Sequence, residues 1–253
     1  MTNEYLEPFE QVLSELFPPE RVREIEAADG EGQNPKAIAA MEAVEQSGFL
    51  DALVPEAEGG AGLVMHDVTP LWMALGRHAV ALPIGETMIE RATTETELAR
   101  RAHALALMQA AAIAGAADRL LEISIAHANE RVQFGKPIGR QQAVQQQLAV
   151  MAQDTVAVRL GVELGASRGW PGAEVAATAK TVAAEAAPRI AATAHAVLGA
   201  MGISAEHDCH LYTRALHRWR LAGGAETLWS RKLGAVLLDD DRTSLDWVRE
   251  TLF

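Results

Sequence analysis

The feature that most constrains the fold is a lack of strand-like alternation combined with long alanine-rich stretches of helical periodicity. After position 141 apolar side chains recur at steps of three, four and seven residues, as on one helix face: Val144, Leu148, Met151, Val158 and Val162. The segment 174–198 is a second alanine-rich helix, and small side chains favour close helix packing. The sequence therefore predicts an all-α protein.

Charge and composition narrow the classes of partner. Hydrophobic residues make up 49% and charged residues 22%, which is ordinary for a globular protein. The formal net charge of -12 opposes contact with nucleic-acid phosphates or an anionic membrane. The apolar stretch 104–117 is too short to span a bilayer, and residues 1–10 lack a signal pattern. The one cysteine, Cys209, excludes an internal disulfide. We expect a cytoplasmic protein that binds neither nucleic acid nor membrane.

The chain divides into three segments. Residues 1–83 are predicted to form an N-terminal helical domain, with helices over 5–16, 36–47 and 66–77 and a polar loop over 29–35. Residues 84–96 are a short linker, too short to contain a β domain, and the run Thr93-Thr94-Glu95-Thr96-Glu97 offers caps for the next helix. Residues 97–253 are predicted to form a bundle of long helices.

One loop of the predicted bundle has unusual chemistry. A helix over 98–130 must stop at Arg131-Val132-Gln133-Phe134-Gly135-Lys136-Pro137-Ile138, because glycine and proline do not continue a helix cheaply. One interpretation is a turn with an exposed charge. The other is a loop that offers the Arg131 guanidinium to a phosphate, with Phe134 and an amide beside it to suit a nucleotide. The residues alone leave both interpretations open.

Three motifs give the chain a resemblance to one family. RVQFGKPIGRQQ, over 131–142, resembles the signature turn of the acyl-CoA dehydrogenase family. LGAMGISAEHD, over 198–208, resembles the family's glycine-rich turn, and VPEAEGGAG, over 54–62, resembles part of its N-terminal helical domain. The motifs follow the family's order, and the resemblance covers about residues 37–83 and 98–238.

The resemblance implies a fold and a cofactor. Family members have an N-terminal helical domain, a middle β domain that walls the flavin, and a C-terminal four-helix-bundle-type domain. The cofactor-binding residues that it implies are Arg131, Gln133, Phe134, Gln142, Gly199 and Gly202. Arg131 would pair with the pyrophosphate of flavin adenine dinucleotide (FAD) in a neighbouring subunit. The two glycines would let backbone amides approach the same cofactor.

Two departures from the family pattern limit what this chain does alone. The linker 84–96 stands where the middle β domain would be, so one wall of the flavin pocket is missing. The family's base is a carboxylate that must lie beside the carbon next to the thioester. Gly223 stands at its usual position, and no acid lies between 98 and 117, where some relatives carry it. No catalytic residue is therefore assigned. Glu226 is the nearest carboxylate, and its alternative role is a favourable charge in the first turn of a helix.

From this resemblance we expect a half-site subunit of a heteromeric FAD-dependent acyl-CoA dehydrogenase. A larger dehydrogenase-like partner would supply the β domain and the base in an α2β2 assembly, and the two subunits would share FAD. The substrate would be an acyl-CoA, in some relatives a sterol-derived thioester. Two alternatives stay open: a self-sufficient homo-oligomer with Glu226 as base, and a non-enzymatic helical scaffold.

Other clusters of reactive residues have ordinary explanations. His207, Asp208, Cys209 and His210 resemble a metal site, but ligands at one helix start would diverge. We expect Asp208 to cap the helix and no metal to bind. The aspartates 239–241 are expected to mark the solvated end of a helix over 226–238.

Overall fold

The computed structural model describes residues 4–27 and 34–252, which are mostly helical. Before the bundle come α1 (Leu6–Leu16), α2 (Pro19–Ala27), α3 (Pro35–Gln46), the short 3-10 helices η1 (Phe49–Asp51) and η2 (Glu56–Glu58), α4 (Met65–Arg77) and α5 (Ile84–Arg91). Most of the polar loop expected over 29–35 lies outside the described residues. The prediction of an all-α protein is confirmed.

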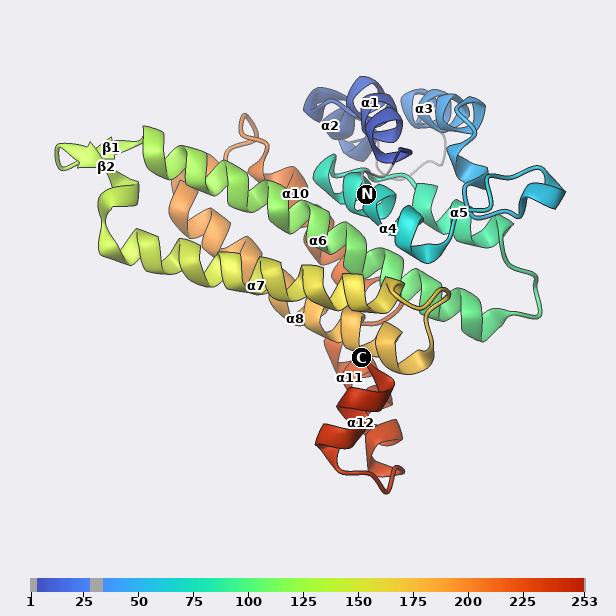
Figure 1. Cartoon of the computed structure of the whole chain (residues 1–253). Helices are drawn as coiled ribbons and strands as arrows, with labels where there is room; N and C mark the ends of the chain where they lie inside the picture. The colour runs from blue at the N-terminus through green and yellow to red at the C-terminus, as the bar shows by residue number, and fades with distance from the viewer. Residues whose placement is uncertain (1–3, 28–33, 253) are drawn as a thin grey trace.

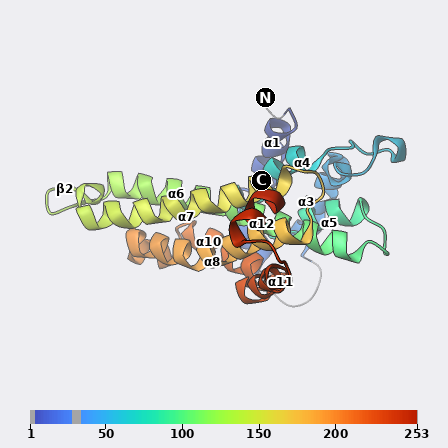
Figure 2. The same ribbon diagram turned by 60° about the horizontal axis from the view of Figure 1, so that its bottom comes forward.

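The second part of the chain is an up-and-down bundle with an arm (Figure 1). Its helices are α6 (Leu98–Glu130), α7 (Gln142–Ala166), α8 (Ala173–Leu198) and α10 (Cys209–Leu221). Between them lie β1 (Val132–Gln133), β2 (Lys136–Pro137), the 3-10 helix η3 (Ile138–Arg140) and α9 (Ala200–Ile203). The arm consists of α11 (Glu226–Leu238), which packs on α8, and α12 (Ser244–Thr251). Figure 2 shows the β1–β2 hairpin at one end of the bundle, away from the N-terminal helices.

Small residues let α6 lie at the centre of the core. All side chains from Ala106 to Ala117 are buried, and most of them are alanines. The closest approach is to α4: a Cβ on Gly115 would lie 1.8 Å from the carbonyl oxygen of Met73, and one on Gly76 would lie 2.0 Å from that of Ala112. A continuous hydrophobic core therefore joins the N-terminal helices to the bundle.

The length and hydropathy of α6 would also allow it to cross a membrane, but 78% of the relevant window is buried inside the protein. A long helix in the middle of a core has the same composition, because all of its faces meet other helices. The apolar character of α6 is accounted for by its neighbours α4, α7, α8 and α10.

The segment between the N-terminal helices and the bundle is more ordered than a simple linker. Residues 84–91 form α5, whose Ile84, Met88 and Ile89 are fully buried as the helix packs on α6 and η1. Within the described chain no strand occurs between α4 and α6, so no β domain stands here. The N-cap of α6 is Glu97, which lies within the expected capping run 93–97, but its side chain makes no capping hydrogen bond to the helix. Instead the Glu97 carboxylate accepts the backbone N–H of Thr94 at 3.0 Å and tightens the preceding turn.

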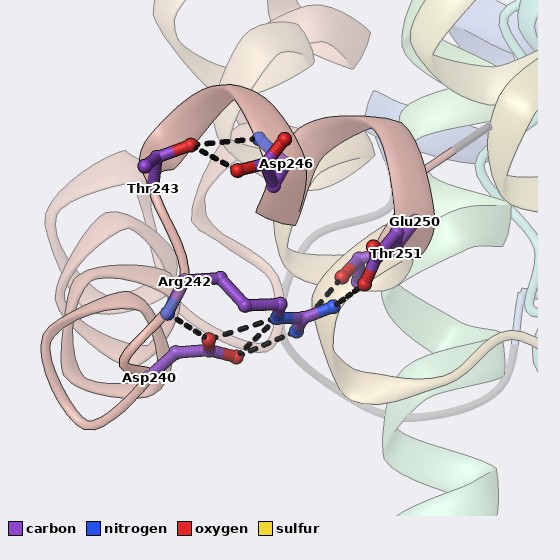
Figure 3. Close-up of polar contacts among 6 residues, drawn as sticks. All are labelled: Asp240, Arg242, Thr243, Asp246, Glu250 and Thr251. Atoms are coloured by element: carbon purple, nitrogen blue, oxygen red, sulfur yellow. Dashed lines mark hydrogen bonds and ion pairs between the residues drawn. The ribbon is translucent and has the colours of Figure 1, made fainter.

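Besides α5, the helices α2 and α12 are not predicted from the sequence. The Pro18-Pro19 pair follows the end of α1, and Pro19 begins α2, because proline suits the first position of a helix. The helix α12 begins after Thr243, whose Oγ1 accepts the backbone N–H of Asp246 at 3.2 Å (Figure 3). Both helices are short, and short segments carry a weak periodic signal.

Candidate functional site

The segment after α6 is a tight β-hairpin. Its register pairs Val132 with Pro137 and Gln133 with Lys136. Phe134 and Gly135 form the turn with φ of 52° and 76°, and two successive positive φ values match the twist of paired strands. The Ile138 N–H donates to the carbonyl of Arg131 at 2.8 Å and closes the base of the hairpin. The helix stops where it is predicted to stop, and Arg131 lies at its C-cap.

A glycine corner between α8 and α9 faces this hairpin. Gly199 has φ 59° and ψ -136°, a conformation that essentially only glycine adopts without strain. Its N–H donates to the carbonyl of His195 at 2.9 Å, and the space where its Cβ would point is open. Gly202 differs, because it is buried and its Cβ would lie 2.9 Å from the Cβ of Leu198. Gly199 therefore presents backbone to a cavity, whereas Gly202 lets α9 pack on α8.

The hairpin, the start of α7 and the α8–α9 corner enclose a cavity of about 460 Å³. The polar residues of its lining are His127, Arg131, Gln133, Gln141 and Gln147, and the other lining residues are Ile138, Val144, Ala196, Val197, Leu198, Gly199, Ala200 and Met201. One cation and three amides thus converge on a partly apolar hollow. This combination suits a ligand with an anionic group and a flat polar ring.

The structure brings together three of the six residues implied for cofactor binding. Arg131, Gln133 and Gly199 line the cavity, whereas Gln142 and Gly202 do not. Phe134 is 92% exposed at the tip of the hairpin. Three polar lining residues, His127, Gln141 and Gln147, are not predicted from the sequence. Of these His127 could have been found, because it precedes Arg131 by one helical turn.

The electrostatics of the cavity favour an anion. Burial lowers the pKa of His127, and the positive charges of His207 and Arg131 lower it further, against the opposing effect of Glu130. An anion beside Arg131 would offset that repulsion and favour the protonated imidazole. His127 is therefore placed to respond to the charge of whatever the cavity holds.

The corner between α10 and α11 carries Gly223, where the family resemblance predicts that the base is missing. Gly223 has a φ of 63°, and its carbonyl accepts the indole N–H of Trp229 at 3.2 Å. A Cβ on Gly223 would lie 3.4 Å from Oε1 of Gln109, a buried residue of α6. The nearest carboxylate, Glu226, accepts the Nε–H of Arg220 at 2.9 Å, and this hydrogen bond lowers the pKa of Glu226. A carboxylate held in this way is a weak proton acceptor.

The residues 207–210 are used for local structure. The backbone N–H of Cys209 donates to Nδ1 of His207 at 3.1 Å, and His210 bonds the His207 carbonyl at 2.8 Å. The expected cap by Asp208 is wrong: its side chain makes no capping bond and forms an ion pair with Arg23 of α2. Burial raises the pKa of the Cys209 thiol to about 11. Within the described residues no group of three or more His, Cys, Asp and Glu side chains could hold a metal ion.

The aspartates 239–241 lie at the end of α11, as the sequence analysis predicts. Figure 3 shows Arg242 between Asp240 and Glu250, with its Nη1 2.8 Å from the Glu250 carboxylate. Hydrogen bonds from the Arg242 side chain and backbone lower the pKa of Asp240 to about 2. The cluster ties the α11–α12 turn together.

The fold and cavity define a helical protein with a hollow, lined by an arginine and three amides, at one end of an up-and-down bundle. Residues 96–237 match the family described as "Acyl-CoA dehydrogenase, C-terminal domain". This match covers more than half of the chain. The chain belongs to the acyl-CoA dehydrogenase family.

Its similarity to curated relatives is partial. Acyl-CoA dehydrogenase IpdE2 of Mycobacterium tuberculosis is 38% identical over 112 residues, which are 44% of this chain and 35% of that protein. (R)-Benzylsuccinyl-CoA dehydrogenase of Thauera aromatica is 28% identical over 205 residues, or 77% of this chain and 49% of that protein. The chain thus spans between a third and a half of the length of these relatives.

Solved structures include chains of nearly the same extent. A chain in the crystal structure of the ChsE4-ChsE5 complex from Mycobacterium tuberculosis superposes with a TM-score of 0.79 at 18% identity, covering 96% of this chain and 99% of that one. A chain of the Tcur3481-Tcur3483 steroid ACAD has the same TM-score and identity, with 93% and 98% covered. At this identity the likeness shows that the fold is shared along almost the whole chain.

Proposed function

We propose that this chain is a half-site subunit of a heteromeric, FAD-dependent acyl-CoA dehydrogenase that desaturates an acyl-CoA between its α and β carbons. One observation carries the proposal. A cavity with an arginine, amides and an open glycine corner is assembled at one end of the bundle. In the described chain the two-stranded β1–β2 hairpin is the only sheet, and no β domain is available to close the cavity on the other side.

The residues of the cavity fit a dinucleotide. The Arg131 guanidinium forms a planar fork that matches two phosphate oxygens. The amides of Gln133, Gln141 and Gln147 can donate to and accept from ring edges, and Gly199 leaves backbone accessible. The volume of about 460 Å³ lies within the range of small-molecule sites. The chain offers one wall for FAD, and a partner must supply the other.

The bound flavin would accept the hydride that leaves the β carbon of the thioester. The residues of this chain bind and orient: Arg131 neutralises phosphate charge, and His127 adjusts its protonation to that charge. This chain does not abstract the α proton. Gly223 carries no acid, and Glu226 is held by Arg220. The base and the sheet wall therefore belong to a larger dehydrogenase-like partner.

The comparisons support the partner and the substrate class. Two solved structures that match along almost the whole chain are each named as a pair of proteins, and one of them is called a steroid ACAD. We therefore propose a heterotetramer with two copies of each subunit, acting on a sterol-derived CoA thioester.

Co-expression tests the half-site role. Expressed alone, the chain should be colourless, and with its larger partner it should yield a yellow complex that oxidises the thioester. A yellow, active protein from this chain alone would instead support the homo-oligomer with Glu226 as base. A partnered complex that is inactive and colourless would support the scaffold.

The role of Arg131 is tested within that complex. Arg131→Ala should lower flavin content after dialysis by about tenfold or more, because one charged hydrogen-bonding partner of the phosphate is lost. Arg140→Ala is the matched control, since Arg140 is an exposed arginine of the same loop that does not line the cavity. Equal flavin retention in both variants would contradict the assignment.

A further inference from the structure

A lysine in the middle of the bundle has no part in the proposed cofactor site. Lys180 of α8 is 0% exposed, and a lysine is almost never fully buried without a paired charge. Its amine nevertheless touches no carboxylate. It donates to Oε1 of Gln109 on α6 at 2.8 Å and to the backbone carbonyl of Trp219 on α10. A single side chain thus ties three helices together.

The number of donors matches a neutral amine. A neutral amine has two N–H groups, and both have acceptors here. A protonated amine would bring a third N–H and a charge into the core, where either is costly without a partner. Burial accordingly lowers the pKa of Lys180 to about 7, and the field of Glu226 opposes this only in part.

The ion pairs on the helices packed against α8 do not include the Lys180 amine. On α7, Asp154 pairs with Arg189 and Arg159 pairs with Asp118. On α10, Arg218 pairs with Glu26 and Arg220 pairs with Glu226. On α11, Lys232 lies over the Trp229 ring. Glu226 acts on the Lys180 amine through its charge, without a hydrogen bond. The amine is therefore held by polar groups that carry no charge.

The lysine contacts continue to the glycine corner. The Gln109 amide that accepts from Lys180 lies against Gly223: a Cβ there would be 3.4 Å from Oε1 and 3.5 Å from Nε2. The Gly223 carbonyl is held by Trp229, whose ring packs on Ala106, Ala176 and Ala177. Lys180 thus contacts both sides of the corner. It holds the end of α10 through the Trp219 carbonyl, and it holds the Gln109 amide that lies against Gly223.

We propose that Lys180 is a positioning residue that holds the α10–α11 corner closed over Gln109, so that the chain's own polar groups fill the space beside Gly223 and an acyl thioester cannot enter it. We call this arrangement of Lys180, Gln109 and the Trp219 carbonyl the clamp, and it rests only on the contacts described above. The inference that the closed corner excludes an acyl thioester rests on the proposed function.

Hydrogen exchange on the full chain tests the clamp without flavin or partner. The measurement is made at pH 9, where the Lys180 amine of the wild type is neutral. Relative to the wild type, Lys180→Met should reduce the protection factors of residues 222–229 by about tenfold, because one or two buried hydrogen bonds are lost. Protection at the centre of α6 should not change. Lys180→Gln, which keeps an N–H donor, should recover part of the loss. Unchanged protection at the corner in Lys180→Met would overturn the proposal.

The pH dependence of hydrogen-exchange protection distinguishes a corner held by the Lys180 amine from a corner held by packing of the Lys180 side chain alone. Opening the corner exposes the amine, which then takes up a proton because its pKa returns from about 7 towards 10.5. Corner protection in the wild type should therefore rise more than tenfold between pH 7 and pH 9, once corrected for intrinsic exchange. In Lys180→Met and Lys180→Gln it should be flat, and equal slopes in all three proteins would overturn the proposal.

Adding an acyl-CoA tests whether the α10–α11 corner is closed to a thioester. Butyryl-CoA added to the wild-type chain should leave exchange over 221–229 unchanged. Saturable protection of that segment would show that the corner admits a thioester and would overturn the closed site. Since these measurements use neither flavin nor partner, a failed flavin complex would count against the proposed function and leave the clamp standing.

Discussion

Glu26 of α2 and Arg218 of α10 form an ion pair of 2.9 Å, although 192 residues separate them in the sequence. The Glu26 side chain is only 6% exposed, and Arg214 lies 3.5 Å from its second oxygen. Arg218 also donates to the carbonyl of Val80 at 3.0 Å, just after α4. This pair locks the N-terminal helices to the bundle beside the α10 segment that leads to the glycine corner.

Glu26→Gln should lower the free energy of unfolding by about 1–3 kcal/mol, because it leaves two arginines without their carboxylate in a partly buried setting. Thermal unfolding followed by circular dichroism measures the change. Glu24→Gln, which breaks an exposed pair with Lys36, is the control and should leave the melting temperature unchanged. Equal melting temperatures for both variants would show that the Glu26 pair adds no stability.

Gly115→Ala should destabilise the protein by about 1–3 kcal/mol, since a methyl group 1.8 Å from the Met73 carbonyl forces α4 and α6 apart. The matched control is Gly234→Ala in α11, where the new Cβ meets nothing within 4 Å. That change should stabilise by about 0.5–1 kcal/mol through helix propensity. Chemical denaturation of the three proteins gives both values, and a neutral Gly115→Ala would contradict the close helix contact.

Restoring a carboxylate at the glycine corner should not restore catalysis. Gly223→Glu must adopt a φ of 63° and place its Cβ 3.4 Å from the Gln109 amide. We expect a loss of about 1–2 kcal/mol in stability and no thioester oxidation by this chain alone. Gly223→Ala carries the same backbone strain without the acid, so the two melting temperatures should fall together. Oxidation of an acyl-CoA by Gly223→Glu with added FAD would refute this expectation.

His127 should titrate below the ordinary histidine value, because burial and the charges of His207 and Arg131 disfavour its protonated form. The folded-state pKa is lower than the unfolded one, so protonation favours the unfolded chain. The contribution of His127 to the free energy of unfolding is therefore fully present above about pH 6.5, and it is lost as the pH falls below that value. NMR of the imidazole Cε1–H, assigned by its disappearance in His127→Gln, measures the pKa. A value at or above 6.5 in the free chain would be the contrary result.

Much of the candidate site is predictable from local sequence. The stop after Glu130 follows from glycine and proline, and the Gly199 corner follows from a glycine between two helices. The sequence cannot show that Phe134 turns outwards or that Gly202 faces α8, because both depend on the register of the hairpin and of α9 against their neighbours. The helix α5 is missed because eight residues give too little periodic signal.

The sequence by itself determined that this protein is helical, because helical periodicity and alanine content act within a few turns of chain. It also determined which loops break the helices and which residue types they carry. Only the tertiary structure decided which residues meet. It placed Gln141 and Gln147 in the same cavity as Arg131, and Lys180 against Gln109, 71 residues away. The physical reason is that helix formation is local, whereas a cavity or a buried polar contact depends on how whole helices pack.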